Sequence, residues 1–173
     1  MSEAINSSSL ARPVLWSIPK HSVTAAEIES KAKVLFDRLK TISAEHADVR
    51  FASSLAAEDM VVTDVIVQSG AKISLFTLAT GRLHQETILM TEQVEKHYKI
   101  SIERIQPVAQ DVESFISQYG LNGFYDSEEA KKACCAARKI KPLNKALAGA
   151  KAWLTGQRRE QAVTRSDLPL REL

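Results

Sequence analysis

The sequence predicts an α/β fold, in which a parallel sheet is flanked by helices. Short apolar stretches of strand length alternate along the chain with segments of helical periodicity, a pattern typical of crossover connections between parallel strands. The chain has 173 residues, of which 45% are hydrophobic and 25% charged. This size and composition indicate one globular domain that is large enough to bury a core.

The first half of the chain supplies two helices and two strands. Thr24 and Glu27 form a capping-box pattern, which predicts the start of a helix over residues 25–43. Its apolar residues recur at helical spacing: Ile28, Ala32, Leu35, Phe36, Leu39 and Ile42. Residues 49–55 predict a short strand, residues 56–69 a helix that Gly70 ends, and residues 73–78 a second strand.

The second half continues the alternation. We expect a helix over 84–98, a weaker strand over 99–105, and a helix over 112–119 whose apolar residues fall on one face. Residues 121–132 lose this pattern and predict a loop or a marginal helix before the cysteines. Pro142 fits the first position of a short helix that reaches residue 147, and residues 150–155 predict a further strand. The basic segment 158–171 has no clear periodicity.

Charge and cysteine content limit the classes of function. The net charge of +2 is too small to favour nucleic acid or a membrane surface, although basic residues gather between positions 131 and 171 and suggest an anionic ligand. No apolar run reaches the length of a membrane span. Residues 1–22 are expected to form a flexible tail rather than a signal peptide, with the folded domain over 23–173. Two adjacent cysteines are a poor disulfide framework and point to the cytoplasm.

Two segments that follow predicted strands are candidates for binding a ligand. Ser53 and Ser54 stand where a strand passes into a helix, a position at which free amides attract phosphate, although taken alone an ordinary helix cap is the simpler explanation. Leu78, Gly81 and Arg82 follow the next strand, where glycine allows a backbone to approach a ligand and arginine can bind an anion. The nearby His84 is expected to be an ordinary surface histidine.

Two further candidates lie in the basic half. Cys134 and Cys135 have cationic neighbours, which favour the thiolate form that binds metal, but two small buried hydrophobic residues are an equal alternative. An iron–sulfur cluster normally takes four thiolates, and the sequence contains two cysteines. Gly156 and Arg165 belong to a cationic segment after the last predicted strand. It could hold an anion through its arginines or be a solvated loop.

These segments, taken in order, resemble the assimilatory adenylyl-sulfate (APS) and 3′-phosphoadenylyl-sulfate (PAPS) reductase family. The resemblance covers residue 49 to the end of the chain. It is carried by four runs: 53–59, 80–87, Cys-Cys followed by Arg138-Lys139-x-x-Pro142-Leu143, and 153–165. The adjacent cysteines resemble the APS-using branch. Ala79 departs from the aspartate, and Gln85 from the proline, that the family usually has at these positions.

The resemblance implies an adenine nucleotide alpha-hydrolase-like fold, related to the PP-loop proteins. It implies that Ser53 and the turn after it, with backbone near Leu78 and Gly156, hold the adenylate. Lys139 and Arg165 match positions that bind the phosphosulfate. Cys134 and Cys135 match two of the four ligands of a 4Fe-4S cluster.

The resemblance also implies the reaction, in which a C-terminal cysteine attacks the sulfur of APS and releases AMP. Thioredoxin then reduces the product to sulfite. Since no third cysteine is present, the chain is expected to be C-terminally truncated and inactive alone. The alternatives are a noncatalytic nucleotide-binding remnant, a PAPS-using relative, or a pyrophosphatase of the same fold, whose Ser-Gly-Gly-x-Asp-Ser loop does not occur in this sequence. Association into a homo-oligomer is left open.

Overall fold

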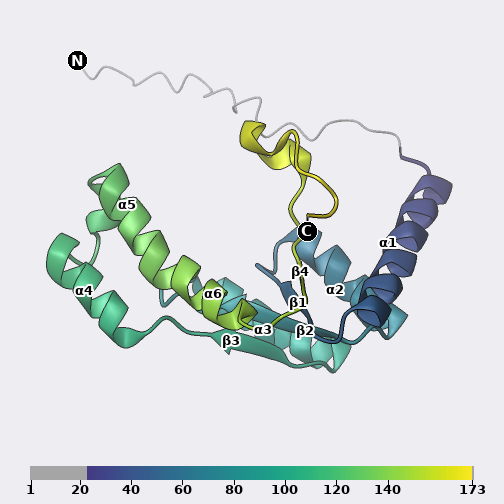
Figure 1. The fold of residues 1–173 in the computed structure, drawn as a ribbon, viewed down its shortest axis with the longest axis horizontal. Helices are drawn as coiled ribbons and strands as arrows, with labels where there is room; N and C mark the ends of the chain where they lie inside the picture. Colours follow the sequence, from purple (N-terminus) through teal and green to yellow (C-terminus); the bar gives the residue numbers. More distant parts are fainter. Residues whose placement is uncertain (1–22, 173) are drawn as a thin grey trace, which may run out of the picture.

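The computed structural model describes residues 23–172 and contains a four-stranded sheet with the order β3-β2-β1-β4 (Figure 1). The strands are β1 (Val49–Ala52), β2 (Ile73–Leu78), β3 (Ile102–Ile105) and β4 (Ala152–Leu154), and every pairing is parallel. The α/β prediction is therefore confirmed. The tail predicted over residues 1–22 lies outside the described residues.

Helices cover both faces of the sheet. One face packs against α1 (Ala25–Glu45), α2 (Ala57–Ser69) and α3 (Gln85–Tyr98). The core between them includes Leu39 of α1, Ile66 of α2, Val94 of α3 and the strand residues Phe51 and Ile102. On the other face, α6 (Lys141–Leu147) contacts β3, whereas α4 (Ala109–Tyr119) and α5 (Glu128–Cys135) form an arm that extends away from the sheet (Figure 1). Among the residues described, no helix combines the length and the apolarity needed to cross a lipid bilayer.

Local signals set the ends of these elements. The capping box of α1 is confirmed, because the Glu27 amide donates to Thr24 Oγ1 at 3.3 Å and the Thr24 amide to Glu27 Oε2 at 2.8 Å. Strand β1 ends at Ala52, three residues before the predicted position, and the chain turns at Leu55, whose φ of 63° lies outside the strand region. Lys99, with a φ of 55°, ends α3 in the same way, so β3 starts at Ile102.

The segment around the cysteines differs most from the prediction. Ser127 caps α5 by accepting a hydrogen bond from the Ala130 amide, and the helix runs through Ala136–Ile140, a π-helical turn, directly into α6. Pro142 was predicted to open a helix but is the second residue of α6, inside this continuous run. The Lys141 amide donates to Ala136 O, five residues back, and this wider turn gives the proline ring room that a regular α-helix lacks.

The carboxylate of Glu95, near the end of α3, fastens the start of β3. Glu95 Oε2 accepts from Arg104 Nη2 at 2.7 Å, and Glu95 Oε1 accepts from the Ile102 amide at 2.8 Å. These two donors lower the pKa of Glu95 below its ordinary value. A carboxyl whose pKa is lowered by folding stabilises the fold above its ordinary pKa, and this contribution is lost as the pH falls through the lowered value.

We therefore expect Glu95→Gln to lower the melting temperature at pH 7 and to make progressively less difference as the pH falls below about 4. Thermal unfolding followed by circular dichroism at pH 7, 5 and 3 measures this. Glu92→Gln is the matched control, because Glu92 is exposed on the same helix. Equal losses for Glu95→Gln at all three pH values would contradict the assigned role.

Candidate functional site

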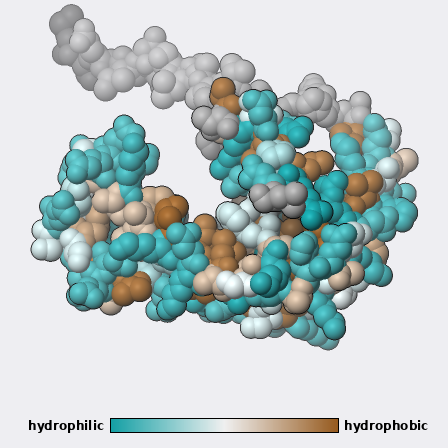
Figure 2. Space-filling model, viewed as in Figure 1, coloured by the Kyte–Doolittle hydropathy of each residue, from teal (hydrophilic) through white to brown (hydrophobic). Residues whose placement is uncertain are grey.

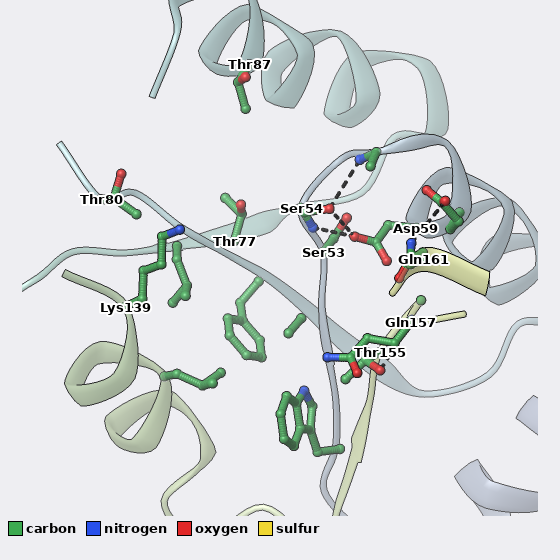
Figure 3. A pocket seen from close by; sticks show the side chains of 18 of the residues that line it. Ser53, Ser54, Asp59, Thr77, Thr80, Thr87, Lys139, Thr155, Gln157 and Gln161 are labelled. Carbon is green, nitrogen blue, oxygen red and sulfur yellow. Dashed lines mark hydrogen bonds between the residues drawn. The ribbon is translucent and has the colours of Figure 1, made fainter. Parts of the chain in front are cut away.

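A cavity of about 420 Å³ opens at the carboxyl ends of β1, β2 and β4 (Figure 3). The chain leaves β1 for β2 and β3 on one side and returns to β4 on the other, so the cavity lies where the strand order reverses. In open parallel sheets, this reversal point is where ligands bind. The volume is in the range of small-molecule sites.

The loop after β1 is fixed by a buried carboxylate. Ser54 donates to Asp59 Oδ2 from both its amide and its Oγ, each at 2.6 Å (Figure 3). The Leu55 amide donates to Ser53 Oγ at 3.2 Å, and Leu55 takes the left-handed conformation already described. Since Asp59 has only 6% of its surface exposed, these hydrogen bonds hold the Ser53–Ser54 turn in one conformation at the cavity edge.

Gly156 brings the loop after β4 against the same carboxylate. A Cβ atom at position 156 would lie 2.1 Å from Asp59 Oδ1 and 3.2 Å from the Asp59 amide nitrogen. Real Cβ atoms do not approach so closely, so the position requires glycine. Asp59 therefore joins the turns after β1 and β4, a role that the sequence did not reveal because its two partners lie on separate segments.

Two cations face the cavity. Lys139 extends from the π-helical turn, with its ammonium group toward the loop that carries Thr80 (Figure 3), and Arg165 comes from the segment after β4. Arg165 Nη1 donates to Gln161 Oε1 at 2.5 Å. Among residues 23–172, neither cation forms an ion pair with a carboxylate, so both are available to an anionic ligand.

An apolar wall and several hydroxyl groups complete the lining. Phe76 is buried at the base, and Trp153 of the edge strand β4 keeps 47% of its surface exposed. Such a combination of aromatic surface and a few polar groups suits a planar heterocycle that carries hydrogen-bonding atoms. Beside the Ser53–Ser54 turn, the remaining apolar and hydroxyl-bearing residues are Ala52, Ala56, Leu78, Leu83, Leu143, Thr77, Thr80, Thr87 and Thr155.

The structure brings six of the eight predicted ligand-binding residues to this cavity and places two elsewhere. The six are Ser53, Ser54, Leu78, Lys139, Gly156 and Arg165. Arg82, predicted to hold an anion, instead donates from Nη2 to Asn122 Oδ1 at 2.7 Å and lies 5.0 Å over the Phe124 ring. Gly81 does not line the cavity either. Its φ of 72° lets the loop turn beside Arg138, whose Nη1 would be 3.2 Å from a Cβ there.

Arg138, which the sequence named only as part of the run after the cysteines, is a buried residue near the site. Only 7% of its surface is exposed, and its Nη1 donates to the carbonyl of Thr80 at 2.9 Å. The bond ties the π-helical turn to the loop after β2. Because Lys139 and Thr80 both line the cavity, Arg138 fixes two of its walls relative to one another.

Cys134 and Cys135 are free, half-buried thiols at the end of α5. Within residues 23–172, no group of three or more His, Cys, Asp or Glu side chains is arranged to hold a metal ion. A 4Fe-4S cluster takes four thiolates. The pair therefore supplies two of the four thiolates that such a cluster takes.

Comparison with known proteins shows which family the chain belongs to. The family model of the phosphoadenosine phosphosulfate reductase domain matches residues 48–173. The chain belongs to this family. The reductase-family chain is 47% identical over 163 residues to an adenosine 5′-phosphosulfate reductase of Neisseria meningitidis serogroup A, covering 93% of this chain and 67% of that protein.

Other relatives give the same picture. An adenosine 5′-phosphosulfate reductase of Burkholderia cepacia is 48% identical over 142 residues, covering 82% of this chain and 57% of that protein. The reductase-family chain thus spans about two thirds or less of the length of these relatives. A crystal structure of phosphoadenylyl-sulfate reductase from Candida auris has the same fold. The TM-score is 0.60 at 18% identity, and the match covers 79% of this chain and 70% of the other.

Proposed function

We propose that this chain binds APS and belongs to an enzyme that reduces APS to sulfite and AMP, with thioredoxin as the electron donor. The observation that carries the proposal is the cavity at the sheet's reversal point, where two cations without carboxylate partners face an apolar wall. A nucleotide with an anionic phosphosulfate matches both features. The relatives named adenosine 5′-phosphosulfate reductase support the choice of APS.

In the proposed complex, the adenylate lies against Leu78 and Gly156 beside the Ser53–Ser54 turn, with the phosphosulfate between Lys139 and Arg165. A cysteine thiolate attacks the sulfur, the bond from sulfur to the phosphate oxygen breaks, and AMP leaves. The resulting cysteine S-sulfonate is then reduced by the two thiols of thioredoxin, which become a disulfide as sulfite leaves. The two cations neutralise charge on the phosphosulfate, which lowers its repulsion of the incoming thiolate.

We assign Cys134 and Cys135 as ligands of a 4Fe-4S cluster whose other two ligands come from outside the chain. Because this assignment leaves neither thiol free to attack, the nucleophile of this proposal also comes from outside this chain. Iron and sulfide analysis, with the visible absorption spectrum of anaerobically purified protein, tests this assignment. We propose the cytoplasm, where thiols stay reduced, as the location of the protein.

Titration calorimetry of the folded chain with APS, AMP and PAPS tests the binding proposal. APS and AMP are expected to bind, and GMP serves as the control nucleotide. If folded protein binds neither APS nor AMP, the proposal is wrong. PAPS binding tighter than APS would favour a PAPS-using relative. Assayed with thioredoxin, this chain by itself is expected to release no sulfite, so sulfite release would refute the assigned source of the nucleophile.

A further inference from the structure

One carboxylate oxygen on α2 collects three hydrogen bonds from the segment that follows β4. Glu58 Oε1 accepts from Arg158 Nε at 2.9 Å, from Arg158 Nη2 at 2.5 Å and from Gln161 Nε2 at 3.1 Å. The partners are about one hundred residues apart in the sequence. The contact therefore fastens the loop after β4 to the first turn of α2.

Gln161 connects Glu58 to Arg165, a residue that lines the cavity. Its amide nitrogen donates to Glu58, so its carbonyl oxygen Oε1 faces the other way and accepts from the Arg158 amide at 3.1 Å and from Arg165 Nη1 at 2.5 Å. Glu58 thus sets the direction of the Gln161 amide, and the amide sets the position of the Arg165 guanidinium. Gln161 and Arg165 both line the cavity.

Apolar packing does little to hold this segment. Residues 157–163 are all exposed, and the two short 3-10 turns Arg159–Gln161 and Val163–Arg165 contain no described side chain that is buried. The segment lies beside the hollow between the arm of α4 and α5 and the rest of the molecule, which Figure 2 shows. With little apolar surface to bury, the segment depends on its polar contacts for a fixed position.

We propose that Glu58 is a positioning residue that holds Arg165 at the cavity through Arg158 and Gln161, and so sets the affinity for the anionic part of the nucleotide. This inference rests on the proposed binding of APS. According to this inference, the acidic residue Glu58 strengthens the binding of an anion in the neighbouring cavity. Simple charge repulsion predicts the opposite, because removing a negative charge near an anion would tighten its binding.

The two explanations separate in Glu58→Gln, which keeps the side-chain shape and removes the charge. If Glu58 holds the segment, APS affinity falls on the order of tenfold, whereas adenosine affinity changes less than about twofold because adenosine lacks the phosphosulfate. Glu160→Gln is the matched control. Glu160 lies on the same segment and is exposed, so its substitution should leave both affinities unchanged.

Two further readouts report on positioning itself. Trypsin should cleave after Arg158 faster in Glu58→Gln than in the wild type or in Glu160→Gln. Gln161→Ala should reproduce the selective loss of APS affinity. Because both residues belong to one chain of contacts, the double variant Glu58→Gln/Gln161→Ala should lose little more than either single variant.

The outcomes are distinguishable. If the folded wild-type chain binds no APS, the proposed function fails. If the wild type binds APS and Glu58→Gln binds it equally well or more tightly, the proposed function stands and the role of Glu58 is refuted. Equal losses of APS and adenosine affinity, with an unchanged melting temperature, would also overturn this inference, because they would place Glu58 in contact with the nucleoside.

Discussion

Substituting Gly156 by alanine is expected to abolish nucleotide binding and to lower the free energy of unfolding by about 1–3 kcal/mol. The added Cβ would meet Asp59 Oδ1 at 2.1 Å. Asp59 is restrained, because its other oxygen accepts from both donors of Ser54. Relief of the clash therefore displaces either the loop after β4 or the Ser53–Ser54 turn. Urea denaturation and calorimetry with APS measure the two effects.

The double variant Gly156→Ala/Asp59→Ala is the control for this mechanism. Asp59→Ala alone should also destabilise the fold, because it leaves the Ser54 amide without its acceptor. In the double variant the clash with Oδ1 is gone and only the 3.2 Å contact with the amide nitrogen remains, so the total loss should be smaller than the sum of the single losses. Strictly additive losses would mean that Gly156 and Asp59 act independently, contrary to the close contact described here.

Lys139→Met is expected to weaken APS binding by roughly 10- to 100-fold, the effect of losing one charge-assisted contact. The free energy of unfolding should change by less than about 0.5 kcal/mol, because Lys139 is exposed and makes no ion pair among the residues described. Adenosine binding should be unaffected. Calorimetry with APS and with adenosine separates the two parts of the nucleotide.

Lys131→Met supplies the matched control, because Lys131 is an exposed lysine of α5 that does not line the cavity. The two variants change the net charge equally. If both weakened APS binding to the same extent, the effect would come from overall charge, and Lys139 would have no specific contact with the ligand.

Much of the fold could be predicted because its signals are local. The alternation of strands and helices follows from residues close together in sequence, and β2 begins and ends where the apolar run 73–78 does. The errors occurred where a backbone conformation decides the boundary. Leu55, in the turn after β1, has a left-handed φ that leucine rarely adopts. The residue type therefore did not predict the turn.

The lining of the cavity was predictable where a residue's position in the chain also fixes its place in space. Ser53, Leu78 and Gly156 follow strands, and the carboxyl ends of parallel strands meet at one edge of a sheet. Arg82 also follows a strand, but its long side chain turns toward Asn122, forty residues further on. Whether Arg82 lines the cavity or lies on the surface depends on its hydrogen bond with Asn122, and the residues close to Arg82 in sequence do not reveal that partner.

The π-helical turn between α5 and α6 limits where a residue can be inserted into this helix or deleted from it. Its one extra residue shifts the angular phase of everything that follows, by about 100° around the axis relative to a regular helix. Deleting Ala136, which does not line the cavity, should therefore rotate Lys139 relative to α5 without removing any side chain of the cavity lining, and should reduce APS affinity as Lys139→Met does. The number of residues between the cysteines and Lys139 thus determines the direction in which Lys139 points, in addition to which side chains are present.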